Sequence, residues 1–194
     1  MNAKLGREKE GIKPGALVSM SSGNHKFASR ILRRLRTYVE KLGYSTPFTE
    51  CLRDQAYAQV AADVVASANS GCPIIIVDWF PNLALEEQGD DDPPSHEDQA
   101  MNFFNDVRAA AHRNRVLVLL GACMSPDALA VGATEDACEY PIRGRRMVEE
   151  RCDYSVICWP DETDQTQTQG KLVTVPESPH RLEKPIPFAF EIPH

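Results

Sequence analysis

The chain has 194 residues, a formal net charge of −7 and a pI near 5.3. This length suits one domain with a buried core and is short for two. With 42% hydrophobic and 25% charged residues, the composition is typical of a folded domain and not of a disordered chain. The acidic balance excludes a protein that coats nucleic acid through overall positive charge, but it is compatible with a local basic face.

The N-terminus and the cysteines indicate an intracellular protein. The first ten residues are charged and lack the apolar core of a signal peptide. No run reaches the roughly 18 apolar residues of a membrane span, so we expect no membrane attachment and a cytoplasmic or nuclear location. None of the six cysteines forms a Cys-x-x-Cys pair or has zinc-finger spacing to a histidine. We therefore expect reduced cysteines that serve as small apolar residues.

Helical patterns recur between strand-like segments. Residues 1–13 are polar and predict a flexible N-terminal segment, which leaves residues 14–194 for a single domain. Three segments space their apolar residues as an amphipathic helix does, at i, i+3, i+4 and i+7. Gly43 and Gly71 are placed to end the first two helices, and Ser95 is placed to cap the third. The expected apolar face of the first helix consists of Phe27, Ala28, Ile31, Leu32, Leu35, Val39 and Leu42.

Strand candidates lie before, between and after these helices. Residues 73–78 and 115–120 are apolar without alternation, as in strands buried on both faces of a parallel sheet. A polar stretch at residues 161–170 predicts a turn ahead of the last two strands. The full series is residues 16–20, 46–50, 73–78, 115–120, 154–159, 171–175 and 186–192. This order predicts an α/β fold, a three-layer sandwich with a mostly parallel central sheet and a C-terminal antiparallel strand pair.

The connection between the first strand and the first helix is a candidate nucleotide-binding segment. In parallel sheets, ligands bind beyond the carboxyl ends of the strands. Lys26 lies where a phosphate loop places its lysine, next to a helix N-terminus. A phosphate loop has glycine before that lysine and Ser or Thr after it, whereas this chain has His25 and Phe27. An ordinary strand-to-helix turn is the alternative. The candidate residues are Ser22, Gly23, Asn24, His25 and Lys26.

Two carboxylates end neighbouring strand candidates. Asp78 follows four apolar residues, as the metal-holding aspartate of a Walker B strand does, so it is a candidate Mg²⁺ ligand. Glu50 ends the second strand and is a candidate catalytic residue that would activate water. A buried strand that happens to end in Asp, and a surface glutamate, are the alternatives.

The order and spacing of these segments resemble the RecA-type ATPase core, and most of all its DnaB-type replicative helicase branch. Residues 14–23 resemble the start of the family's phosphate loop, residues 48–50 the segment with its catalytic glutamate, and residues 73–83 its Walker B strand. Residues 148–162 are similar to its fifth core strand. The resemblance implies a RecA-like central sheet, binding of ATP with Mg²⁺, and assembly with other RecA-like subunits into a homo- or hetero-oligomer.

The chain departs from that family at the residues that perform hydrolysis. His25 crowds the backbone that wraps a phosphate, and Phe27 has no oxygen for a metal. Gly121, Ala122 and Cys123 stand where the family has a polar γ-phosphate sensor. Loss of charge-stabilising groups costs phosphoryl transfer factors of about 100 to 100,000 in rate. We therefore predict weak or absent ATP hydrolysis, as in a degenerate P-loop ATPase.

Clustered arginines stand out in an acidic chain. They predict contact with nucleic acid or with an acidic partner subunit, and a solvated face paired with Asp and Glu is the alternative. The candidate residues are Arg30, Arg33 and Arg34 on the first helix, and Arg143, Arg145 and Arg146 ahead of the fifth strand.

Three hypotheses about function follow. The first is a RecA/DnaB-like protein of DNA replication, recombination or repair with degraded hydrolysis. The second is a non-catalytic pseudo-ATPase subunit that uses the fold for assembly. The third is a Rossmann-like enzyme that processes nucleosides or NAD, with Glu97 as its catalytic acid.

Overall fold

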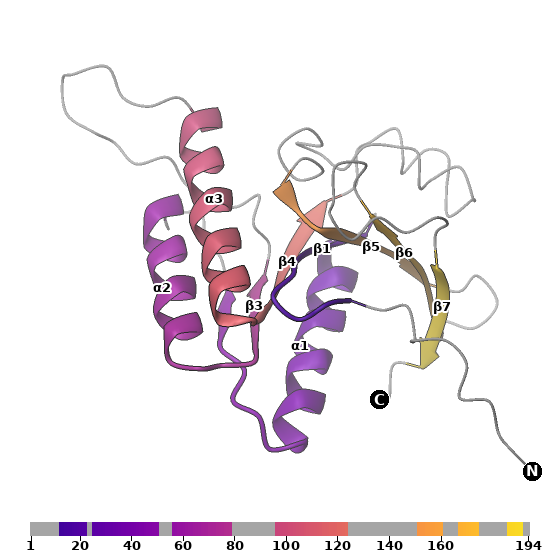
Figure 1. Cartoon of the computed structure of the whole chain (residues 1–194). Coiled ribbons are helices and arrows are strands. Elements are labelled where there is room, and N and C mark those ends of the chain that lie inside the picture. The colour runs from indigo at the N-terminus through magenta and orange to yellow at the C-terminus, as the bar shows by residue number, and fades with distance from the viewer. Residues whose placement is uncertain are drawn as a thin grey trace, which may run out of the picture.

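The computed structural model describes residues 12–22, 25–50, 56–78, 96–123, 151–160, 167–174 and 186–191. Within this part of the chain, one sheet has seven strands in the order β2-β3-β4-β1-β5-β6-β7 (Figure 1). The strands are β1 (Leu17–Ser22), β2 (Phe48–Glu50), β3 (Ile74–Asp78), β4 (Leu117–Cys123), β5 (Tyr154–Pro160), β6 (Gln167–Thr174) and β7 (Ile186–Glu191). The helices are α1 (His25–Lys41), α2 (Tyr57–Asn69) and α3 (His96–Asn114).

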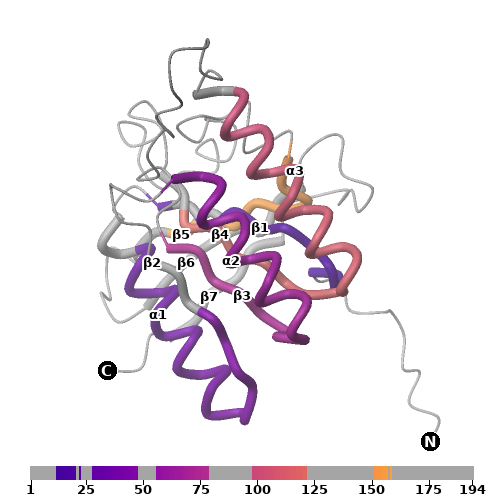
Figure 2. The backbone as a smooth tube through the Cα atoms, turned by 90° about the vertical axis from the view of Figure 1, so that its left-hand side faces the viewer, coloured from indigo at the N-terminus to yellow at the C-terminus, as the bar shows by residue number. Residues whose placement is uncertain are grey.

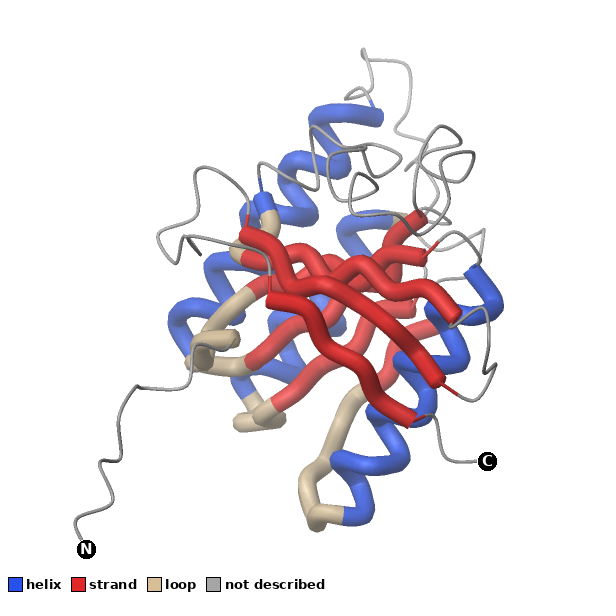
Figure 3. Tube along the Cα trace, turned by 90° about the vertical axis from the view of Figure 1, so that its right-hand side faces the viewer, coloured by secondary structure: helices blue, strands red, loops and turns tan. Residues whose placement is uncertain are grey.

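The first five strands form the parallel part of the sheet. Parallel pairing joins β2 to β3, β3 to β4, β4 to β1 and β1 to β5, which confirms the predicted α/β fold. At one side of this sheet, β6 runs antiparallel to β5 and β7 runs antiparallel to β6 (Figure 1). Figure 3 shows the strands of the sheet, drawn in red, side by side. Strand β4 lies between β1 and β3. The third hypothesis, with Glu97 as its acid, assumed a Rossmann-like fold. Rossmann and flavodoxin-like sheets have the strand orders 3-2-1-4-5-6 and 2-1-3-4-5, which differ from the order found here, so the fold assumed in that hypothesis is wrong.

Helices cover both faces of the sheet and give it three layers (Figure 2). Side chains alternate between the two faces along each strand, so each buried strand serves two cores. On one face, Leu17, Val77 and Leu120 pack with residues of α2 and α3. On the other face, Val18 and Ile76 pack with the buried side of α1. None of the helices that the structure describes is both long and apolar enough to cross a bilayer.

The apolar face of α1 is largely as expected, with one error at its end. Ala28, Ile31, Leu32 and Val39 are buried, but Leu42 is 56% exposed. The helix ends at Lys41, and Gly43 takes a left-handed φ of 87° that turns the chain away from the helical path. Leu42 therefore lies beyond the last helical turn and cannot follow the helical face.

Several strand boundaries also differ from the sequence expectation. β1 continues through Ser22, where a turn was predicted, and β6 begins at Gln167, inside the predicted turn at 161–170. β4 begins at Leu117 and not at Arg115. Arg115 has a left-handed φ of 56° and follows the end of α3, where the Val116 amide donates a hydrogen bond back to the Ala111 carbonyl.

Two buried cysteines give a direct test of the core around β5. Cys152 and Cys158 are free, buried thiols, as expected for cysteines that act as small apolar residues. Burial raises the pKa of Cys158 to about 12, and burial together with the Asp153 charge raises the pKa of Cys152. At pH 8 a thiol with a pKa of about 12 has a thiolate fraction of about one in ten thousand, and only the thiolate reacts.

We therefore predict that iodoacetamide at pH 8 leaves Cys152 and Cys158 unmodified in the folded chain. Peptide mass spectrometry after a timed reaction measures this, and half-buried Cys72 serves as the internal comparison. Both cysteines should react fully once the protein is unfolded in urea. Rapid alkylation of Cys158 in the folded state would contradict its burial.

Candidate functional site

The carboxyl ends of the parallel strands bring the sequence-predicted carboxylates to one edge of the sheet. Glu50 and Asp78 are register partners on β2 and β3. Ser22 ends β1 and is the register partner of Cys123 on β4 and of Cys158 on β5. The backbone positions of Ser22, Glu50 and Asp78 therefore share one edge, with β4 between β1 and β3.

Helix α1 begins at this same edge. β1 ends at Ser22 and α1 starts at His25, so two residues connect them, and these two, Gly23 and Asn24, lie outside the described residues. His25 and Lys26 are the first two residues of the helix. The first turn contains no acidic residue, which leaves the positive end of the helix dipole without a compensating carboxylate in that turn. An anion is favoured at such a helix end.

Asp78 is a buried carboxylate that contacts α1. Its side chain is 2% exposed, and Ser29 Oγ donates a hydrogen bond of 2.8 Å to its Oδ1. Arg33 Nε lies 4.0 Å from its Oδ2, with 56% of the Arg33 side chain exposed. Ser29 and Arg33 are four residues apart, so they share one face of the helix. This cluster was not predicted from the sequence, although the i, i+4 spacing and the strand-end aspartate were visible there.

The described residues do not fit a magnesium site at Asp78. Mg²⁺ needs several oxygen ligands in octahedral geometry, whereas Asp78 Oδ2 lies 4.0 Å from the guanidinium of Arg33, a positive group that opposes a metal ion. A metal here would put a second cation beside Arg33. No group of three His, Cys, Asp or Glu side chains suited to a metal occurs in the described part of the chain.

The predicted arginine contacts divide into two sets. Arg30 and Arg33 are exposed on α1, and Arg34 is half-buried, with its Nη1 atom buried and without a hydrogen-bond partner among the described residues. Arg36, on the same helix, pairs with Glu40 at 2.8 Å. The second set, Arg143, Arg145 and Arg146, lies outside the described residues.

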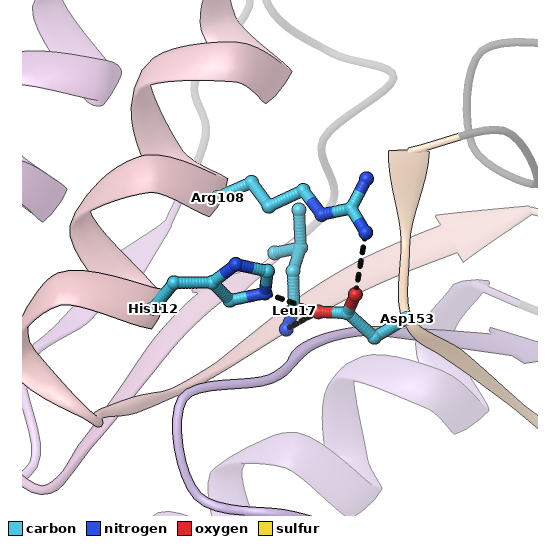
Figure 4. Close-up of polar contacts among 4 residues, drawn as sticks. All are labelled: Leu17, Arg108, His112 and Asp153. Atoms are coloured by element: carbon cyan, nitrogen blue, oxygen red, sulfur yellow. Dashed lines mark hydrogen bonds and ion pairs between the residues drawn. The ribbon is translucent and has the colours of Figure 1, made fainter. Parts of the chain in front are cut away.

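A second charged cluster lies at the opposite, amino-terminal edge of the parallel sheet (Figure 4). Asp153, which directly precedes β5, is fully buried and accepts a hydrogen bond of 2.8 Å from the Leu17 backbone amide. Arg108 Nη2 lies 2.8 Å from its other oxygen, and His112 Nε2 lies 3.0 Å from Oδ2. The Asp153 amide in turn donates to the Leu17 carbonyl at 2.7 Å. The cluster joins β1, β5 and α3, and it was not predicted from the sequence.

A close approach of the backbone accompanies the Asp153 cluster. Gly15 has a left-handed φ of 88°, and a Cβ atom added there would lie 3.3 Å from the Ala111 carbonyl oxygen. The chain therefore enters β1 directly over the end of α3, where only glycine fits without adjustment. This contact and the Asp153 cluster together fix the corner between α3 and the sheet.

Comparison with known proteins gives matches in structure and none in sequence. A scan of protein-family models and a search of curated proteins found no match. A solved structure described as an ATPase domain aligns with a TM-score of 0.63 at 10% identity, covering 92% of this chain and 82% of that chain. The structure of a DnaB-like replicative helicase, described with its interactions with primase, aligns with a TM-score of 0.65 at 8% identity.

The helicase match covers 92% of this chain and 57% of the helicase chain, so this chain spans little more than half of that protein's length. At these identities the likeness concerns the fold. It confirms the fold that the order of sequence segments predicted. The chain has the fold of a RecA/DnaB-type ATPase core.

Proposed function

We propose that this chain is a RecA/DnaB-like ATPase-fold protein that acts in DNA replication, recombination or repair, with weak or lost ATP hydrolysis. The main support for the proposal is the arrangement of residues at the sheet edge where α1 begins. A helix N-terminus with Lys26 in its first turn follows β1, and β4 separates that strand from β3, which ends in Asp78. The likeness to two ATPase-fold structures supports this assignment.

In this proposal each candidate residue has a defined task. Backbone amides of residues 22–26 and the Lys26 ammonium would bind the phosphates of ATP, because anions are favoured at a helix N-terminus. Glu50, at the end of β2, would orient the water that attacks the terminal phosphate. Magnesium would supply charge neutralisation at the phosphates when bound, and Asp78 as it lies here is committed to Ser29 and Arg33.

Several features count against efficient turnover. The phosphate-loop motif has four residues between its two glycines, whereas two residues connect β1 to α1 here. His25 and Phe27 replace the residues that such a loop has beside its lysine. Each change removes stabilisation from the transition state, which is the main contribution of a protein to phosphoryl transfer.

A non-catalytic assembly subunit is the second candidate function. The pairing of Asp78 with Arg33 favours it, because a carboxylate held by its own chain is not available for catalysis. One of the similar structures is described by its interactions with primase, which is consistent with a fold that engages other proteins. In this form the chain would assemble with RecA-like subunits and bind no nucleotide, and exposed Arg30 on α1 would contact a partner or nucleic acid.

Titration with ATP distinguishes the two candidates. We expect micromolar to millimolar binding by isothermal titration calorimetry, with a loss of at least about tenfold in affinity for Lys26→Ala, since one charged contact to phosphate is removed. Lys41→Ala is the matched control, because it removes the same charge from the other end of α1. Absence of ATP binding, together with a defined oligomer in native mass spectrometry, would overturn the first function in favour of the second.

A further inference from the structure

We propose that Arg33 supplies at Asp78 the positive charge that a divalent cation would otherwise supply, so that this strand-end carboxylate anchors α1 and does not bind metal. The proposal rests on the contacts of Asp78 and holds whether or not the chain binds nucleotide. Asp78 Oδ1 accepts a hydrogen bond from Ser29 Oγ at 2.8 Å, and Asp78 Oδ2 lies 4.0 Å from Arg33 Nε. Both partners come from α1, which packs on this face of the sheet.

Burial makes such partners necessary. Asp78 is 2% exposed and follows the buried apolar residues of β3. A carboxylate in this position is tolerated when it is hydrogen-bonded and paired with an opposite charge. Ser29 supplies a hydrogen bond and Arg33 supplies a charge. The chain therefore provides internally the positive charge that a metal ion would otherwise supply.

The sequence of α1 is consistent with an arginine in place of a metal ion beside Asp78. In a phosphate loop, the residue after the lysine is Ser or Thr, which shares the metal with the Walker B aspartate. This chain has Phe27 at that position, and the hydroxyl that contacts the aspartate belongs to Ser29, farther along the helix. Arg33 follows one turn later on the same face. In a phosphate-loop protein, the aspartate would have a hydroxyl and a metal ion nearby. Here Asp78 has the hydroxyl of Ser29 and the guanidinium of Arg33.

Arg33 is accordingly a positioning residue. It and Ser29 hold α1 against β3, and the first turn of α1 contains His25 and Lys26. Loss of Arg33 would take away the positive charge that this residue places beside the buried Asp78 carboxylate. The same loss would remove the cation that opposes metal binding at Asp78.

Thermal unfolding of the full chain tests the pairing. Asp78→Asn and Arg33→Gln should each lower Tm by several degrees, and the double variant should fall short of the sum of the two shifts by about 2 °C or more. Arg36→Gln is the matched control, because Arg36 is on the same helix but pairs with Glu40. Its shift should be additive with that of Asp78→Asn. Additive shifts for Arg33 and Asp78 would overturn the proposal.

Metal binding is tested first on the wild-type chain, whose expected result does not depend on whether the variants fold. Mn²⁺, as a probe for Mg²⁺, should show no protein-bound fraction by electron paramagnetic resonance, and about 10 mM MgCl₂ should leave Tm unchanged relative to EDTA. A bound Mn²⁺ fraction that disappears in Asp78→Asn would overturn the proposal.

Thermal unfolding in the presence of ATP distinguishes this inference from the proposed function. If ATP binds, the rise in Tm that it causes should be the same in MgCl₂ and in EDTA. A rise that requires Mg²⁺ and is lost in Asp78→Asn would overturn the inference while nucleotide binding stands. No rise under either condition would count against nucleotide binding, whereas the coupling between Arg33 and Asp78 would still support the inference.

Discussion

We expect the purified chain to release phosphate from ATP at less than about 0.1 s⁻¹, which is roughly a hundredfold below the median enzyme turnover of about 10 s⁻¹. The reason is the set of groups that stabilise charge as the γ-phosphoryl moves. Phe27 provides no oxygen for a metal, and Asp78 contacts Ser29 and Arg33. His25 stands in place of the glycine that lets a backbone wrap the phosphate.

A coupled phosphate-release assay with saturating ATP measures this rate. If hydrolysis is lost altogether, Lys26→Ala and Glu50→Gln should not lower this rate further, because a background rate does not depend on either side chain. The double substitution His25→Gly, Phe27→Thr restores the two residues that the phosphate-loop motif requires, and it should raise ATP affinity by about tenfold or more. Steady turnover in the wild-type chain that is lost in Lys26→Ala would contradict weak hydrolysis.

The sequence predicted the parts of this fold that depend on local patterns. Apolar runs within residues 73–78 and 115–120 indicated doubly buried strands, and β3 and β4 lie inside the parallel sheet with helices on both faces. The glycine after α1 ends that helix, as its position predicted. Because parallel strands share one direction, the same patterns brought Glu50 and Asp78 to a common edge as register partners.

The contacts of the charged residues were not predictable from local patterns. Ser29 and Asp78 are 49 residues apart in the chain, and Leu17 and Asp153 are 136 apart. Which arginine reaches a carboxylate depends on where α1 and α3 cross the sheet, and a single sequence does not contain that information. Arg33 was predicted as a partner contact from its place in the arginine cluster, and the sequence did not show that its Nε also lies 4.0 Å from the buried Asp78 carboxylate.

The second large effect is expected at the opposite edge of the sheet, where Asp153→Ala should lower the free energy of unfolding by about 3 kcal/mol. The substitution leaves the buried Leu17 amide without its acceptor, which alone costs about 1–3 kcal/mol. It also removes the contacts to Arg108 and His112, whose contribution is reduced because 28% and 43% of those side chains are exposed.

Urea titration followed by far-UV circular dichroism measures the Asp153→Ala effect, and Tm should fall by about 6–12 °C. Asp106→Ala is the matched control, since Asp106 is an exposed aspartate of α3 and its removal should change stability by less than about 0.5 kcal/mol. Arg108→Ala should be intermediate, because Asp153 keeps the Leu17 amide and His112. Equal stabilities of Asp153→Ala and Asp106→Ala would contradict the cluster. The Asp153 cluster lies at the amino-terminal edge of the strands, opposite the candidate site. We therefore expect Asp153→Ala to lower the stability of the fold without changing any direct contact at that site.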